Sequence, residues 1–356
     1  MFTIYSDKNI FESLISSFEE FPNWNRIIND HAEIVLDTDQ TILDSQIEDP
    51  ENILFLFLHS NARSIELKSA KPIFQNIYSK LDTVLDDPKA VYFLNLTQSE
   101  AEKLQEDTGI IINCGNKIDD DILLKGVNLD WLAEEEIQNN WANILTPFYN
   151  YPSNSIIIND RNLFSNEERR VNIGVNNILR ILGNLLPISL AVDYHILIQT
   201  EQKPETKNKS KCDDLARLLN EGIRALRSYN FQIEIIFYFA GTNFYKHTHN
   251  RRIYSNYKYG KSENSLASFK IHNLNITRND DSFSLISFFN RLSSASDTEN
   301  FLIAHRNGTN RSKEISADCV DKINKNGPND RYYRYYLNGS EIVQGQAISI
   351  YNRLLN

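Results

Sequence analysis

The first half of the chain alternates between apolar runs typical of strands and amphipathic runs typical of helices. Residues 2–7 alternate apolar and polar side chains, and residues 32–39 form a second strand-like run after a segment with helical spacing. Residues 90–114 predict a strand, a helix and a further strand, and Thr97 and Glu100 have the spacing of a capping box. This β-α-β order predicts a three-layer α/β sandwich with a mostly parallel sheet.

The second half repeats this order after a break in periodicity. Residues 146–154 (TPFYNYPSN) combine prolines with asparagines, which interrupt regular structure. Beyond them, strand-like and helix-like segments alternate at residues 155–164, 171–187, 190–200, 212–229 and 231–241. In the first half, residues 51–61 (ENILFLFLHSN) carry a continuous apolar run and are predicted as a buried strand. We therefore expect two α/β domains, at residues 1–148 and 152–356.

Acidic and basic residues are divided unequally between the two halves. Positions 1–150 hold 27 Asp and Glu against 10 Lys and Arg, a net charge of −17. Positions 151–356 hold 20 acidic and 27 basic residues, a net charge of +7, which the overall value of −10 conceals. Such asymmetry indicates that the basic half meets a polyanion, while the acidic half repels it or meets a different partner. Acidic runs such as residues 119–121 also solvate a surface, which explains the −17 but not the +7.

Composition places the chain among folded proteins of a reducing compartment. Its 41% of apolar residues, with 17 Tyr and 19 Phe, can build a core, which excludes a disordered chain. Cys114, Cys212 and Cys319 lie far apart without a CxxC pattern, which argues against a disulfide framework and a zinc site. The sequence opens without a secretion signal, and no apolar run approaches the roughly 20 residues that cross a bilayer. We therefore expect a cytoplasmic protein with no membrane span.

The most informative stretch lies at residues 246–261, within a longer segment, residues 235–262, that contains no acidic side chain. In a strand, alternate residues share a face, so His247, His249 and Arg251 could point at one ligand. An imidazole beside guanidinium groups suits a phosphate, because His can attack phosphorus and Arg can hydrogen-bond the charged oxygens. We expect the surrounding side chains to bind the backbone of DNA or RNA, namely Lys246, His247, Arg252, Tyr254, Tyr257, Lys258 and Lys261.

His249, Arg251 and Asn256 follow the spacing of an HxKxxxxD motif, so this region resembles a phospholipase D superfamily domain. The preceding order of a helix, a strand and the motif-bearing strand is also similar. The resemblance implies that His249 is the nucleophile that forms a phosphohistidine, that Arg251 clamps the phosphate, and that Asn256 replaces the carboxylate of the motif. One copy of the motif is present, whereas catalysis in the superfamily combines two. A homodimer could supply the second copy, and a degenerate domain that only binds phosphate is equally compatible. A basic strand that matches the motif by coincidence is the third alternative.

Two further segments of the basic half carry cations. The run RYYRYY at residues 331–336 places Arg331 and Arg334 among tyrosines, as in sites where bases stack on rings. The alternative is a tyrosine-rich β-ribbon whose arginines cover ring faces. Residues 305–314 (HRNGTNRSKE) are predicted as a glycine-containing loop, suited to phosphate or to solvation.

In the acidic half, carboxylates follow the predicted strands. Asp7, Asp37, Asp39 and residues 119–121 fall near strand ends, where they could hold Mg²⁺ for phosphodiester cleavage. The opening strand and helix resemble those of PIN-like nucleases, so the domain is expected to be Rossmann-like or PIN-like. The alternative is that these carboxylates are solvated strand ends and helix caps. No cofactor other than this Mg²⁺ is expected.

These patterns together predict a protein that binds the phosphodiester backbone of nucleic acid and, in one interpretation, cleaves it as a phospholipase D-like nuclease. The domain combination resembles components of prokaryotic defence or mobile-element systems, in which the acidic domain would be an effector or would bind a protein partner. The alternative is a non-catalytic interaction module whose basic domain binds a protein or anionic lipid.

Overall fold

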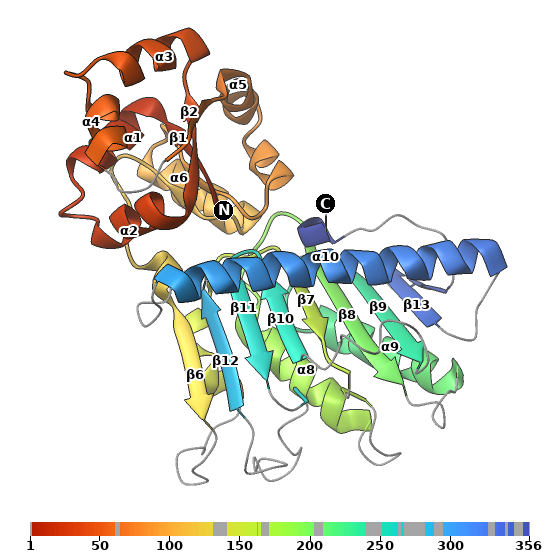
Figure 1. Ribbon diagram of the computed structural model, residues 1–356. Helices are drawn as coiled ribbons and strands as arrows, with labels where there is room; N and C mark the ends of the chain where they lie inside the picture. The colour runs from red at the N-terminus through yellow and green to blue at the C-terminus, as the bar shows by residue number, and fades with distance from the viewer. Residues whose placement is uncertain are drawn as a thin grey trace. The chain divides into compact units, whose positions relative to one another are not determined.

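The computed structural model divides the chain into two compact units, each with its own sheet (Figure 1). Unit 1 comprises residues 1–124 and 289–302, and unit 2 comprises residues 125–288 and 303–356. The structure describes residues 2–60, 65–130, 141–161, 163–164, 171–202, 209–239, 251–262, 265–266, 282–287, 295–326, 332–338, 341–344 and 352–355. Divided in this way, unit 1 contains 25 acidic and 10 basic residues and unit 2 contains 22 acidic and 27 basic residues. The opposite charge of the two halves therefore belongs to two folded bodies.

Unit 1 is built on a sheet of parallel strands. The strand order is β3-β2-β1-β4-β5, from β1 (Phe2–Asp7), β2 (Ala32–Asp37), β3 (Leu67–Ser69), β4 (Val91–Phe93) and β5 (Ile112–Asn113). Parallel strands need crossover connections, and the alternating sequence supplies them as helices. The strand order reverses between β1 and β4, as in Rossmann-like doubly wound folds. The predicted α/β fold is therefore confirmed.

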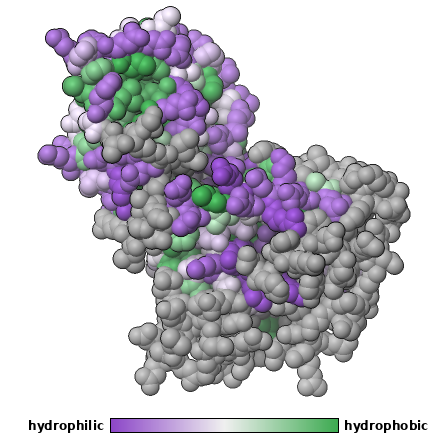
Figure 2. Space-filling view, in the orientation of Figure 1, coloured by the Kyte–Doolittle hydropathy of each residue, from purple (hydrophilic) through white to green (hydrophobic). Residues whose placement is uncertain are grey.

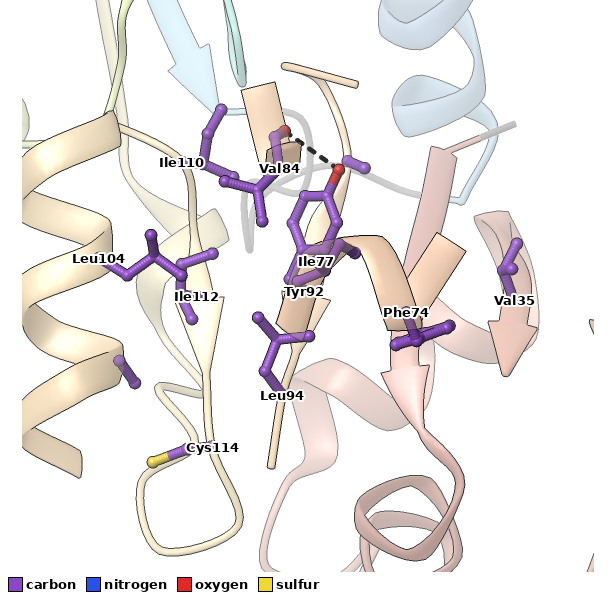
Figure 3. Close-up of a cluster of buried hydrophobic side chains, with 12 residues drawn as sticks. Val35, Phe74, Ile77, Val84, Tyr92, Leu94, Leu104, Ile110, Ile112 and Cys114 are labelled. Atoms are coloured by element: carbon purple, nitrogen blue, oxygen red, sulfur yellow. Dashed lines mark hydrogen bonds between the residues drawn. The ribbon is translucent and has the colours of Figure 1, made fainter. Parts of the chain in front are cut away.

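Helices cover both faces of this sheet. They are α1 (Lys8–Ser16), α2 (Pro22–His31), α3 (Gln40–Glu48), α4 (Ile53–Ser60), α5 (Lys71–Ser79), α6 (Gln98–Thr108) and the 3-10 helices η1 (Leu81–Asp86) and η2 (Ile122–Leu124). On one face, the ring of Phe93 lies 5.0 Å from that of Trp24 in α2. On the other, the hydroxyl of Tyr92 donates to the carbonyl oxygen of Val84 in η1 at 3.1 Å, within an apolar cluster that α5 and α6 complete (Figure 3). Successive residues of β4 thus point to opposite helical layers, because side chains alternate along a strand.

Two local predictions in unit 1 have different outcomes. The capping box is confirmed, because the Thr97 hydroxyl accepts from the backbone N–H of Glu100 and the Glu100 carboxylate accepts from that of Thr97. The buried strand predicted at residues 51–61 is wrong, because Ile53–Ser60 form α4. A short apolar run has no period that separates a strand from a helix, and here the Asn52 side chain accepts from the backbone N–H of Leu54 at the start of the helix.

Unit 2 is built on a mixed sheet in the order β14-β13-β9-β8-β7-β10-β11-β12-β6 among the described residues. Its parallel centre consists of β7 (Ser155–Asn159), β8 (Tyr194–Gln202) and β9 (Phe231–Phe239). Antiparallel strands extend it on both sides: β6 (Gly126–Asp130), β10 (Arg251–Ser255), β11 (Lys258–Ser262), β12 (Ser282–Ser287), β13 (Tyr332–Asn338) and β14 (Glu341–Gln344). The β-α-β-α-β order read from the sequence corresponds to this parallel centre.

Helices also cover both faces of the larger sheet. α8 (Val171–Leu185) and α9 (Lys209–Arg224) lie on one face, and α10 (Ala295–Asn326) crosses the other (Figure 1). The shorter helices are α7 (Trp141–Ile144), η3 (Thr146–Phe148) and η6 (Arg353–Leu355). The amide of Gln199 donates to the backbone oxygen of Ser312 at 3.0 Å and to the hydroxyl of Ser316 at 3.2 Å, which fixes α10 over β8.

The structure corrects two expectations for the basic half and agrees with one alternative for a third segment. The division between the units falls at residue 124, before the break at residues 146–154, because β6 pairs with β12 and joins the larger sheet. Residues 305–314 are not a loop but part of α10. The tyrosine-rich run forms β13 and a hairpin with β14, as the ribbon alternative stated.

Among the described residues, no helix has the length and apolar character needed to cross a membrane.

Candidate nucleic-acid interface

One edge of the larger sheet gathers basic side chains from segments that are far apart in sequence. In parallel sheets flanked by helices, ligands bind beyond the carboxyl ends of the strands, where β7 ends at Asn159. β10 runs antiparallel to β7 with Arg252 opposite Asn159, so β10 begins at the edge where β7 ends. Arg161 is the second residue after β7 and is partly exposed, as are Arg251 and Arg252. This sheet edge therefore holds three guanidinium groups.

A fourth cation lies on the neighbouring strand. Arg252 is directly opposite Lys261 in the antiparallel pair of β10 and β11. Residues directly opposite each other share a face of the sheet, and two like charges in such a pair destabilise it. Arg252 donates to the backbone oxygen of Arg251 at 3.1 Å, and its guanidinium carbon lies 5.7 Å from the centre of the Tyr259 ring. These contacts hold a positive group in place beside a second one, an arrangement that an anion would stabilise.

Asp160, an acidic residue at this edge, is engaged by the fold. Asp160, which follows β7, is almost fully buried. Its carboxylate accepts from the hydroxyl of Ser265 at 2.8 Å and from the backbone N–H of Leu266 at 2.6 Å. Asp160 thus holds the segment that follows β11 against the end of β7.

The structure does not bring together the motif residues that it describes. Arg251 begins β10, whereas Asn256 follows its last residue, so about 17 Å of strand separates them. Asn256 is fully buried, and its side-chain oxygen accepts from the backbone N–H groups of Asn154 and Ser155 at 3.0 and 3.1 Å. Its amide also donates to the side chain of Asn154. This geometry gives Asn256 a structural role at the start of β7, while His249 lies outside the described residues.

Several side chains expected to contact nucleic acid are enclosed by the protein. Arg334 and Glu234 are both almost fully buried and form an ion pair between β13 and β9, with 2.6 Å between Nε and Oε1. Burial raises the pKa of the Glu234 carboxyl, and the Arg334 guanidinium opposes that rise. Tyr254 and Tyr257 are also buried. The expectation that these side chains meet a nucleic acid at the surface is therefore corrected, whereas Lys246, His247 and Arg331 lie outside the described residues.

Lys258 is buried among aromatic rings instead of lying on the basic edge. Its side chain has no exposed surface, and its Nζ has no hydrogen-bond partner in the described part of the chain. The nitrogen lies 4.6 Å from the ring centre of Tyr151 and 5.6 Å from that of Phe148. Burial lowers the pKa of the ammonium from 10.5 to about 7. Lys258 is thus a residue of the core, and its expected role at the interface is corrected.

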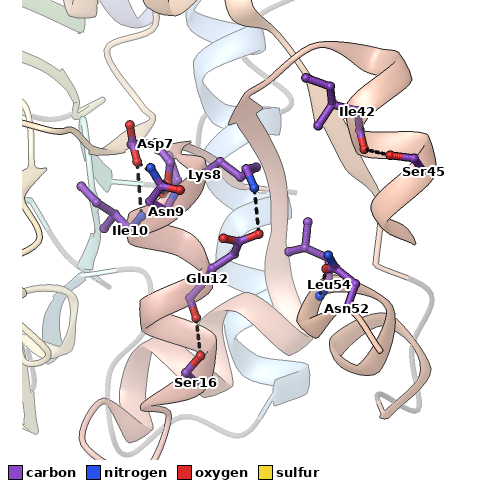
Figure 4. A network of polar contacts seen from close by, with 11 residues as sticks. Asp7, Lys8, Asn9, Ile10, Glu12, Ser16, Ile42, Ser45, Asn52 and Leu54 are labelled. Atoms are coloured by element: carbon purple, nitrogen blue, oxygen red, sulfur yellow. Dashed lines mark hydrogen bonds and ion pairs between the residues drawn. The ribbon is translucent and has the colours of Figure 1, made fainter. Parts of the chain in front are cut away.

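The acidic strand ends of unit 1 were the other candidate site. Asp7 and Asp37 lie in register at the ends of β1 and β2. The Asp7 carboxylate accepts from the backbone N–H groups of Asn9 and Ile10, which caps α1 (Figure 4). Burial raises the pKa of the Asp37 carboxyl, and the Asp7 carboxylate raises it further. Asp39 accepts from the Lys71 ammonium at 2.7 Å.

The acidic run of residues 119–121 also serves the fold. The Asp120 carboxylate accepts from the backbone N–H groups of Asn23 and Trp24 near the start of α2, at 3.1 and 3.0 Å. In the described ranges, no three His, Cys, Asp or Glu side chains are grouped so that they could hold a metal ion. The described carboxylates thus cap helices and form an ion pair, as the alternative stated, and a Mg²⁺ site at these strand ends stays a prediction.

The sequence contains a signal that could have identified the Arg252–Lys261 pair. Only Asn256 and Tyr257 separate β10 from β11, and a two-residue connection between strand-like runs is typical of a β-hairpin. Counting outward from that connection places Arg252 opposite Lys261. No protein-family model matches the chain, and no characterised protein sequence is similar to it.

Proposed function

We propose that unit 2 binds the phosphodiester backbone of nucleic acid at the sheet edge formed by Arg161, Arg251, Arg252 and Lys261. The observation that carries this proposal is the register that sets Arg252 directly opposite Lys261. The two like charges repel each other, and an anion bound between them would relieve that repulsion. Guanidinium groups also form fork-shaped hydrogen bonds with phosphate. The excess of basic residues in unit 2 is consistent with a polyanionic ligand.

Salt dependence tests the proposal. The full chain is titrated into fluorescently labelled single-stranded DNA, duplex DNA and RNA at several salt concentrations, and anisotropy gives the affinity. Each phosphate that the protein neutralises contributes about −0.7 to −0.9 to the slope of log affinity against log salt. We expect the double variant Arg252→Gln, Lys261→Gln to lose about 1.5 of this slope and at least tenfold in affinity near 100 mM salt.

Lys125→Gln is the matched control, because Lys125 is exposed and precedes β6 at the opposite edge of the same sheet. It should leave the slope unchanged. Equal effects of the control and the double variant would contradict the proposal, as would the absence of nucleic-acid binding by the wild type at 50 mM salt. Binding to vesicles that contain phosphatidylserine, without binding to nucleic acid, would favour the lipid alternative.

Cleavage is tested separately with the substitution His249→Ala. If the wild type cleaves a nucleic acid and the variant binds it without cleaving, His249 acts in the reaction. If the wild type cleaves neither DNA nor RNA, with or without Mg²⁺, unit 2 is a binding module.

A further inference from the structure

The helix α4 of unit 1 exposes apolar side chains on the side that faces away from the core. Leu54 and Phe57 are buried, as expected for the inner side of a surface helix. Leu56, however, is 54% exposed, and Ile42 on the neighbouring α3 is 46% exposed. Figure 2 shows apolar residues gathered on this part of unit 1. A helix that is apolar on all sides is typical of one that another molecule covers.

A pocket adjoins this exposed side. It has a volume of about 390 Å³ and lies between α1, α2 and α4. Phe18 and Phe57, whose ring centres are 6.0 Å apart, contribute apolar wall, and Leu56 lies at the pocket as well. Asn25 and Asn29 of α2, whose side-chain amides bond each other, form a polar wall. The pocket can receive an apolar side chain of a partner that also covers Leu56.

The charge around this surface limits what the partner can be. Residues 8–60 contain eleven acidic and two basic side chains. Glu19, Glu48, Asp49 and Glu51, close in sequence to the helices around the pocket, are exposed. This charge repels nucleic acids and anionic lipid surfaces, and it attracts a segment rich in Lys and Arg. A second copy of unit 1 would bring the same negative charge.

We propose that this surface docks a basic amphipathic helix of a partner protein. We name it the α4 surface and define it by Leu56, Ile42 and the pocket between α1, α2 and α4. Apolar residues of the partner helix cover Leu56 and fill the pocket, while its Lys and Arg side chains face the acidic residues around it. Helix-in-groove binding of this kind uses anchors spaced three or four residues apart. This function is independent of the basic edge of unit 2.

The probe is a labelled peptide of about 15 residues in which Leu and Lys alternate with helical spacing, and anisotropy with the full chain measures its affinity. We expect Leu56→Asp to weaken binding at least tenfold, which corresponds to about 1.4 kcal/mol. The direction of the change in affinity is decisive, because Leu56→Asp adds a negative charge to a surface that meets a basic peptide. If the peptide were held by charge alone, this variant would bind it more tightly.

Ile73→Asp is the matched control, since Ile73 is 43% exposed on α5 of the same unit and receives the same charge. It should not weaken binding, and a peptide with Glu in place of Lys should bind at least tenfold less tightly than the Lys peptide. Ser60→Trp, which fills the pocket from its exposed rim, provides a second variant outside the core. Circular dichroism and urea midpoints verify that the variants fold.

Three results would overturn the proposal. The first is equal binding of the Lys peptide by Leu56→Asp and the wild type. The second is equal binding of the Lys and Glu peptides. The third is a wild-type dimer in sedimentation that Leu56→Asp dissociates, because the α4 surface would then be an interface between two copies of the chain. The variant Arg252→Gln, Lys261→Gln should bind the Lys peptide as the wild type does, which separates this inference from the proposed function.

Discussion

Replacing Lys258 with methionine is expected to stabilise the protein at neutral pH. Methionine has a similar length and shape but no charge, so it can occupy the same space beside Tyr151 and Phe148 without the cost of burying an ammonium group. Lysine can avoid that cost only by losing its proton. Its effect on stability must therefore depend on pH.

The magnitude follows from the pKa of Lys258, which burial lowers from 10.5 to about 7. Each unit of pKa corresponds to about 1.4 kcal/mol, so the charged side chain destabilises the folded state by about 5 kcal/mol. Contact with aromatic rings offsets up to about 2 kcal/mol of this, since a desolvated cation is attracted to a ring face. We therefore expect Lys258→Met to raise the free energy of unfolding by about 3 kcal/mol or more at pH 6.

The pH dependence provides the sharper test. Between pH 7 and 10.5 the unfolded chain holds a proton on Lys258 that the folded chain has released. Wild-type stability therefore rises with pH across this window, and the cost is fully present below pH 7. The advantage of Lys258→Met should shrink by up to about 1.4 kcal/mol for each pH unit above 7.

Urea unfolding at pH 6, 7, 8 and 9 measures this difference. Lys125→Met is the control, because Lys125 is an exposed lysine of the same unit. It should change stability by no more than about 0.5 kcal/mol, without a pH trend. A difference between Lys258→Met and the wild type that stays constant from pH 6 to 9 would refute the reasoning. So would a variant that is less stable than the wild type throughout.

Two further predictions concern packing in unit 2. Glu234→Gln should destabilise the protein by about 3–5 kcal/mol in urea unfolding, because the buried Arg334 guanidinium then loses the charge of the Glu234 carboxylate, and replacing both residues with leucine should recover most of the loss. Arg217, which forms an exposed ion pair with Glu221, provides the control. A smaller loss of stability for Glu234→Gln than for Arg217→Gln would contradict the prediction. Gly308→Ala in α10 should lower stability by about 1–3 kcal/mol, because the added carbon would lie 2.2 Å from a buried tyrosine ring of β10. In Gly183→Ala of α8, the added carbon lies 3.6 Å from its nearest neighbour, an ordinary contact distance, so the substitution should stabilise the helix by up to about 1 kcal/mol. Thermal unfolding measures both variants, and a change of stability with the same sign in both would contradict the prediction.

The sequence by itself determined much of the fold. The alternation of strand and helix patterns predicted the parallel sheet of unit 1 and the parallel centre of the mixed sheet of unit 2, since crossover helices of this length connect parallel strands. The capping box at Thr97 was visible because its hydrogen bonds join residues only three positions apart. The opposite charges of the two halves needed only counting. All of these features are local in sequence or additive along it.

The candidate site depended on features that are not local. Residues 246–261 are rich in cations, but composition does not show that Arg252 and Lys261 reach one sheet edge while Lys258 turns into the core. Side chains alternate between the faces of a strand, so a shift of one residue in register exchanges the exposed and buried sets. The buried partner of Arg334 lies 100 residues away on β9, where only strand pairing brings it.

Helix α4 also shows that the sequence pattern alone does not decide which apolar side chains are buried. Its apolar run satisfied the pattern of a buried strand, and nothing within those eight residues shows that one side would remain exposed. That outcome was decided by packing against α1 and α3, which bury Leu54 and Phe57 and leave Leu56 at the surface. Hydrophobicity along the chain states which residues gain from burial, whereas the tertiary structure decides which of them find a neighbour.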